Sequence, residues 1–151
     1  MEDGMFARIA SASSELDRCL EIRRAVFIDE QGVDEALELD GLEDTCMHFV
    51  AWKDEPYEID RAIGTARLLL DHDRNAKAQR VAVQKAARRC GIGRLLMREL
   101  EAEAQRQGAH CVLLGAQLTA MAFYQKIGYE AYGAEFDDAG IPHRMMRLRL
   151  R

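Results

Sequence analysis

The sequence lacks the features on which several classes of protein depend. It has no excess of positive charge, since 21 Lys and Arg stand against 26 Asp and Glu, and the net charge of −5 argues against a nucleic-acid-binding surface. No apolar run is long enough to cross a membrane, and the first residues lack the uninterrupted apolar segment of a signal peptide. The four cysteines form no C-x-x-C pair and no zinc-site spacing with histidine. We therefore expect free thiols in a cytoplasmic protein that uses no metal, binds no nucleic acid and contacts no membrane.

The composition is that of a globular domain. Of the 151 residues, 48% are hydrophobic and 31% are charged, and the chain is long enough to bury a sizeable core without disulfides or metals. No internal repeat, low-complexity tract or linker divides it. We therefore expect one domain over residues 1–151.

The hydrophobic periodicity predicts alternating strands and helices. Strands are expected at 5–9, 47–52, 62–70, 80–83, 111–116, 129–133 and 146–150. Helices are expected from Ser14, with Asp17 in a capping box, to Gln31, from Gly93 to Gly108, and over 119–128. Asp54, Glu55 and Pro56 are expected to join the second and third strands, and the acidic segment 34–44 is expected to be a solvated loop. This order predicts a mixed sheet covered by helices.

The segment RRCGIGRLL (88–96) places two glycines where a helix begins. Glycine is a weaker N-cap than Ser, Asp or Asn, so Gly91 and Gly93 indicate that a ligand approaches the bare main chain. A helix N-terminus offers unpaired N–H groups to an anion. The string G-x-x-x-x-G-K-[ST] does not occur, and Leu96 replaces the third glycine of the dinucleotide fingerprint. A tight turn without a ligand remains the alternative for these glycines.

Longer motifs carry a resemblance to a known family. RVAVQKAARRCGIGRLLMREL (80–100) resembles the central motif of the GNAT superfamily of N-acetyltransferases, Q/R-x-x-G-x-G/A between a strand and a long helix. VLLGAQLTAMAFYQKIGYE (112–130) is similar to the family's next segment, with its F-Y-x-K-x-G-[FY] pattern. The segments AIGTARLLL, RRAVFIDEQGV and GIPHRMMRL extend the resemblance over nearly the whole chain, towards a bacterial branch of small GNAT proteins. The resemblance implies an α/β (α+β) fold with a mixed, mostly antiparallel sheet flanked by helices.

The resemblance implies acetyl-CoA as the cosubstrate. In the family the glycine loop holds the pyrophosphate, and the preceding strand pairs with the pantetheine arm; Val81 and Val83 occupy that strand here. The implied pyrophosphate cradle consists of Arg88, Arg89, Cys90, Gly91, Ile92, Gly93 and Arg94. Lys85 replaces a proline that is common after the central strand, and residues 115–117 lack the family's frequent asparagine.

Three side chains are candidates for the chemistry. Tyr124 matches the family's tyrosine, which lies near the coenzyme A sulfur and can protonate the departing thiolate; the alternative is a packed aromatic beside Phe123. Glu30, at the end of the first helix, and His143, on a loop before the last strand, are the candidate bases. The alternative for Glu30 is a solvated helix end. His48, at the head of an apolar strand, is expected to be structural.

These observations predict an N-acetyltransferase that moves an acetyl group to a primary amine by direct transfer in a ternary complex. The acceptor is a small molecule or a protein amine, and Glu30 with the acidic segment 34–44 favours a cationic one. The alternative is a coenzyme A-binding sensor or regulatory module that keeps the fold without catalysis. A homodimer is possible, because dimers are common in the resembled family.

Overall fold

A seven-stranded sheet organises the part of the chain that the computed structural model describes, residues 4–54 and 58–151. Its strands are β1 (Met5–Ile9), β2 (Met47–Lys53), β3 (Gly64–Leu70), β4 (Asn75–Val83), β5 (Cys111–Gln117), β6 (Glu130–Asp138) and β7 (Ile141–Arg149). The order across the sheet is β1-β2-β3-β4-β5-β7-β6. The pair β4–β5 is parallel and the other five pairs are antiparallel. The predicted mixed, mostly antiparallel α/β sheet is confirmed.

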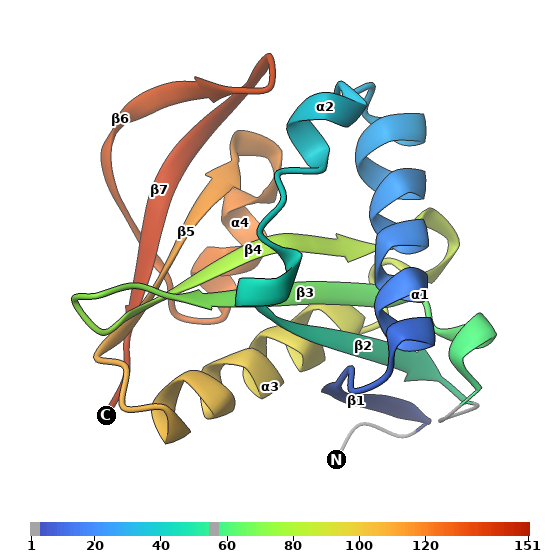
Figure 1. Cartoon of the computed structure of the whole chain (residues 1–151). Helices are drawn as coiled ribbons and strands as arrows, with labels where there is room; N and C mark the ends of the chain where they lie inside the picture. The colour runs from blue at the N-terminus through green and yellow to red at the C-terminus, as the bar shows by residue number, and fades with distance from the viewer. Residues whose placement is uncertain (1–3, 55–57) are drawn as a thin grey trace.

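Helices cover both faces of this sheet (Figure 1). The helices are α1 (Ser13–Arg23), which continues as the π-helix η1 (Arg24–Glu30), then α2 (Glu35–Glu38), α3 (Ile92–Arg106) and α4 (Met121–Lys126). Short 3-10 turns are η2 (Glu43–Thr45), η3 (Ile59–Arg61), η4 (Lys85–Ala87) and η5 (Leu118–Ala120).

The alternation of side chains along β2 explains why both faces need a cover. Phe49 and Ala51 belong to the core cluster that includes α3, whereas Val50 and Trp52 pack in a second cluster with α1. All four side chains are buried. A strand with two apolar faces is stable only between two layers of helices, and these layers place α1 on one side and α3 on the other.

The sheet splits between β4 and β5. These strands pair only where residues 75–77 meet residues 111–113, and beyond this point they diverge, as Figure 1 shows. A register shift in the β3–β4 pairing accompanies the split, and Arg80 there has a φ of +53°. Residues 78–83 of β4 therefore have no described strand on their β5 side. This split is the feature that positions the site.

The structure corrects several details of the predicted elements. The expected capping box does not form: Ala12 is the N-cap of α1, and the Glu15 carboxylate accepts a hydrogen bond from the Ser11 amide at 2.9 Å. The acidic segment 34–44 is not simply a loop, because it contains α2, with Asp34 as its N-cap. Strands β4 and β7 each begin five residues before the prediction. Glu55 and Pro56, expected in the connection before β3, lie outside the described residues.

Candidate active site

A cavity of about 340 Å³ occupies the split in the sheet. Its walls come from residues 78–83 of β4 and 114–117 of β5, and from residues of η1, α2, α4 and the β6–β7 turn. Both faces of the sheet contribute, since Tyr124 belongs to the core cluster of α3 and Val26 to that of α1. A ligand could therefore reach the cavity from either face.

The backbone before α3 is shaped to hold an anion. Gly91 is the N-cap of α3 with a φ of +100°, and Arg89 also lies in the left-handed region, with a φ of +66°. Within the described chain, the amides of residues 89–94 donate to no hydrogen-bond acceptor, whereas the Leu95 amide donates to the Gly91 carbonyl. Consecutive free N–H groups at the start of a 15-residue helix form an anion-binding concavity. Gly91 is required because the left-handed conformation is costly for a residue with a Cβ.

The second glycine also has a physical cause that the sequence did not predict. A Cβ on Gly93 would lie 3.1 Å from Cζ of Phe123, so the bare backbone at this position makes room for an aromatic ring of α4. The interpretation of Gly93 as an opening for a ligand is therefore incomplete. The contact joins the start of α3 to the helix that carries Tyr124.

The expected cofactor residues fall into two groups. Val81, Val83 and Arg88 line the cavity, the two valines on the stretch of β4 without a partner on its β5 side. The loop from Arg89 to Arg94 is not part of the cavity wall and lies at the start of α3. The side chain of Ile92 is buried in the core, so only its amide is available to a ligand.

Tyr124 is buried on α4, with 8% of its surface exposed, and lines the cavity. Its ring makes edge contacts with Phe123 and Tyr129, at centroid distances of 4.9 and 5.7 Å. Its hydroxyl forms no hydrogen bond with a described residue, although a buried tyrosine usually finds a partner. Burial raises the pKa of Tyr124 well above its ordinary value, which keeps the hydroxyl protonated at neutral pH. The side chain is therefore a proton donor that faces a cavity.

His143, on β7, lines the same cavity and is 8% exposed. Its Nδ1 lies 2.7 Å from the carbonyl oxygen of Ile141, and its ring stacks on Phe136. A carbonyl oxygen only accepts, so Nδ1–H donates to it and Nε2 is the ring nitrogen that remains available to accept a proton. This orientation suits a base.

Glu30 lies apart from Tyr124 and His143. Its carboxylate binds Arg88 through two hydrogen bonds of 2.6 Å, and it is not part of the cavity wall. The hydrogen bonds from Arg88 lower the pKa of Glu30, which weakens it as a base. The proposed role of Glu30 as a base is thus not supported by its position.

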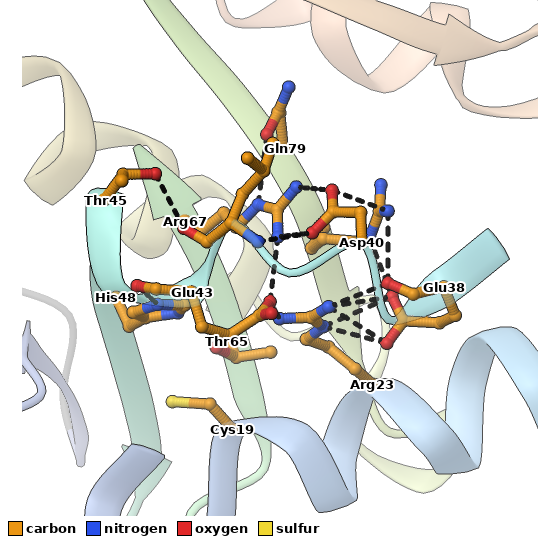
Figure 2. Close-up of polar contacts among 12 residues, drawn as sticks. Cys19, Arg23, Glu38, Asp40, Glu43, Thr45, His48, Thr65, Arg67 and Gln79 are labelled. Atoms are coloured by element: carbon orange, nitrogen blue, oxygen red, sulfur yellow. Dashed lines mark hydrogen bonds and ion pairs between the residues drawn. The ribbon is translucent and has the colours of Figure 1, made fainter. Parts of the chain in front are cut away.

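The acidic segment contacts three arginines that the sequence analysis did not single out, and Figure 2 labels two of them, Arg23 and Arg67. Arg23 of α1 and Arg67 of β3 are each 1% exposed, and Arg80 comes from the bulge of β4. Their partners are Glu38, Asp40 and Glu43, and the three arginines and three carboxylates form a charge-balanced cluster, hereafter the arginine–carboxylate cluster. The sequence feature that could have identified Arg67 is the presence of a charged residue inside the otherwise apolar run TARLLL.

Hydrogen bonds fix the geometry of this cluster. Arg23 Nη2 donates to the Glu38 carbonyl and to Glu38 Oε2, both at 3.1 Å, and Arg23 Nη1 donates to Glu43 Oε1 at 2.7 Å. Arg80 Nη2 donates to the Glu38 carbonyl at 3.2 Å, while its Nε lies 2.7 Å from Glu38 Oε2 without hydrogen-bond alignment. The carboxylates are therefore committed to holding α2 on the sheet.

Two features are absent from the described residues. No three of their His, Cys, Asp and Glu side chains lie together as a metal site would require. None of their helices combines the length and the apolar character that a membrane crossing needs.

The split sheet, the free amides before α3 and the cavity lined by Tyr124 are the features that define the class of this protein. Comparison with known proteins identifies the class. The family profile of the acetyltransferase (GNAT) domain matches residues 13–150. The chain is 36% identical over 143 residues to the uncharacterised N-acetyltransferase YjcF of Bacillus subtilis, and the match covers 94% of the chain and 98% of YjcF.

Solved structures agree with this match. A protein from Lactobacillus plantarum, provisionally described as an N-acetyltransferase, superposes with a TM-score of 0.88 at 29% identity, covering 99% of this chain and all of that one. Escherichia coli ElaA superposes with a TM-score of 0.81 at 27% identity, covering 95% of this chain and 98% of that one. The chain belongs to the GNAT acetyltransferase family, and its fold is that of an acyltransferase.

Proposed function

We propose that the protein is an acetyl-CoA-dependent N-acetyltransferase that transfers the acetyl group directly to a primary amine. The observation that carries this proposal is the pairing of two features: free amides at residues 89–94, and a cavity beside them that holds the unpartnered hydroxyl of Tyr124. The first feature suits a diphosphate and the second suits a reaction that needs a proton donor.

The residues present fit coenzyme A. When bound, acetyl-CoA supplies an activated acetyl thioester. The free amides of residues 89–94 would bind the diphosphate, with the Arg89 and Arg94 side chains adding positive charge at the start of α3. Val81 and Val83 lie on the stretch of β4 that lacks a neighbouring strand, where backbone groups can pair with the amides of the pantetheine arm.

Two side chains of the cavity would move the protons. His143 accepts the proton of the amine at Nε2, since its Nδ1–H is held by the Ile141 carbonyl. Tyr124 donates its phenolic proton to the departing thiolate, since it lines the cavity and its hydroxyl has no described hydrogen-bond partner. We further propose a cytoplasmic location, in which the four free cysteines stay reduced.

The test is an initial-rate assay with acetyl-CoA and a panel of primary amines, which follows thiol release and identifies the product by mass spectrometry. We expect acetylated amine, and rate lines that intersect in a double-reciprocal plot, as a ternary complex requires. Parallel lines would indicate a covalent acetyl-enzyme and contradict direct transfer. Tight binding of acetyl-CoA without transfer to any amine would instead support a coenzyme A sensor.

A further inference from the structure

We infer that the amine acceptor carries an apolar substituent, alkyl or aryl, which binds against Phe27, Val33 and Leu37 at the side of the cavity formed by η1 and α2. This inference rests on the proposed function and names the class of its substrate. It replaces the cationic acceptor that the acidic segment suggested.

The first step is the direction of approach. The free amides lie at the start of α3 and Tyr124 lies on α4, so the cofactor residues belong to the sheet face covered by these two helices. Val26 and Phe27 of η1, with Val33 and Leu37, line the cavity from the segment that covers the opposite face. An acceptor that meets the cofactor inside the split therefore enters past η1 and α2.

The second step is the character of that entrance. Phe27 is half-buried, whereas Leu37 is 57% exposed and still forms part of the cavity wall. Ile141 lines the wall from the β6–β7 side. Leu37 therefore presents apolar surface at the cavity wall that a bound ligand would cover. The entrance is thus suited to an apolar group.

The third step concerns charge. Of the carboxylates that suggested a cationic acceptor, Glu38, Asp40 and Glu43 are paired with buried or partly buried arginines, and Glu30 is paired with Arg88. The other carboxylates of the segment, on Asp34, Glu35 and Asp44, do not line the cavity. A second ammonium group on the acceptor would have to compete with guanidinium groups that these carboxylates already bind. Asp138, an exposed residue at the β6–β7 turn, is the remaining carboxylate on the described cavity wall and has to be tested separately.

The fourth step is rigidity. Arg23 and Arg80 hold both the carbonyl and the carboxylate of Glu38, the residue after Leu37. The side chain of Gln117 on β5 donates to Gln31, just after η1, at 2.8 Å. The apolar entrance is therefore tied to the sheet on both sides, which lets it select a substrate by shape.

The experiment measures kcat/KM for a homologous series of linear alkylamines from ethylamine to hexylamine. We expect kcat/KM to rise about two- to fourfold per added methylene, the ratio that burial of one methylene gives. The linear diamine in which a second ammonium replaces the terminal methyl of hexylamine should be at least tenfold poorer than hexylamine. In Leu37→Asn, the ratio of kcat/KM between successive alkylamines should fall towards 1. In the matched control Leu39→Asn, which alters an exposed leucine outside the cavity wall, this ratio should stay as in the wild type.

Three results would overturn the inference while leaving the proposed function intact. These are a flat alkylamine series, an equal loss of slope in the two leucine variants, and a diamine that reacts as well as hexylamine. If Asp138→Asn abolished such a diamine preference, the acceptor would be a cation bound at the β6–β7 turn. Failure to acetylate any amine would contradict the proposed function together with the inference.

Discussion

Tyr124 and Tyr129 illustrate how two similar residues acquire different roles from their surroundings. Their rings are in edge contact, and both are buried in the same core cluster. The Tyr129 hydroxyl donates to Glu101 Oε2 at 2.8 Å, whereas Tyr124 lines the cavity and its hydroxyl has no described partner. The first hydroxyl is committed to structure and the second is available for chemistry.

Replacing each tyrosine by phenylalanine separates these roles. In Tyr124→Phe we expect kcat to fall about 100- to 10,000-fold, the usual contribution of a general acid, with little change in acetyl-CoA affinity or melting temperature. In Tyr129→Phe we expect the reverse: an almost unchanged kcat and a loss of about 1–3 kcal/mol in unfolding free energy, because Glu101 loses a hydrogen bond in a partly buried site. Steady-state kinetics and thermal unfolding measure both effects. A wild-type kcat in Tyr124→Phe under chemistry-limited conditions would exclude the proposed acid.

The two buried histidines allow a similar comparison for the base. We expect His143→Gln to lower kcat/KM about 100- to 10,000-fold, because glutamine keeps a polar side chain but cannot accept the amine proton. His48→Gln should leave kcat/KM unchanged, since His48 Nε2 contacts the Glu43 carbonyl at 3.0 Å and His48 does not line the cavity. The measurement is kcat/KM for both variants with one acceptor. Equal losses in the two would show that His143 acts only through the fold.

At the scale of single elements, the start of α3 carries the cofactor part of the account. Arg94 lies in the first turn of α3 and Arg98 lies one turn later, and both are exposed. Arg94 is thus close to the free amides, and Arg98 lies one helical turn further from them. They therefore form a matched pair for testing where the diphosphate binds.

Arg94→Glu places a negative charge beside the proposed diphosphate site. We expect acetyl-CoA affinity to fall about 10- to 100-fold, since hydrogen bonds and contacts to charged groups contribute about 1.5–3 kcal/mol each. The fold should not suffer, because an acidic residue in the first turn of a helix stabilises it by about 0.3–1 kcal/mol. Arg98→Glu should change acetyl-CoA affinity less than threefold. Arg98 lies beyond the first turn of α3, where the influence of a charge on the helix N-terminus has fallen off. Calorimetric titration of both variants gives the comparison, and equal losses would place the diphosphate elsewhere.

The elements were predictable to the extent that local pattern determines them. Strands such as β1 and β5, and helix α3, follow from apolar periodicity and from Gly91 and Gly108 near the helix ends. The reason for Gly93 was not predictable, because the Phe123 ring that occupies its space is thirty residues away in sequence. The capping box failed because Glu15 rather than Asp17 binds the backbone at the helix start.

At the scale of the whole molecule, long-range charge pairing explains what the sequence could not indicate about the site. The acidic segment 34–44 reads as a solvated loop, and only the fold brings Arg23, Arg67 and Arg80 to it from three separate elements. The same holds for Glu30, which is paired with Arg88 from fifty-eight residues away. The candidate residues Tyr124 and His143 were found from motif and loop position, but their shared cavity required the split between β4 and β5.

Buried and paired charges also predict how stability depends on pH. Burial lowers the pKa of His48 below its ordinary value of 6.5, so the folded state keeps it neutral while the unfolded state takes up a proton. The hydrogen bond from Arg8 lowers the pKa of Glu15 from 4.5 to about 2, and that from Arg67 lowers the pKa of Asp40. All three groups bind more protons when unfolded, so they stabilise the fold above their ordinary pKa values and this stability is lost as pH falls.

We therefore expect the melting temperature to fall as pH drops below about 6.5, and more steeply below about 4.5 as the carboxylates protonate in the unfolded state. His48→Gln should flatten the upper part of this profile and Glu15→Gln the lower part. Thermal unfolding followed by circular dichroism across this pH range provides the measurement. A melting temperature that stays constant from pH 7 to 5 in the wild type would contradict the assignment of His48 as a buried neutral group.

The most direct test of the central claim is an amide NMR titration of the ¹⁵N-labelled protein with acetyl-CoA. The account predicts that the largest shifts occur at the amides of Arg89–Arg94, which have no described hydrogen-bond acceptor, with smaller shifts along Val81–Val83 of β4. The amides of α1, which covers the opposite face of the sheet and does not line the cavity, should change little. Binding of acetyl-CoA with no shift at the amides of residues 89–94 would contradict the account.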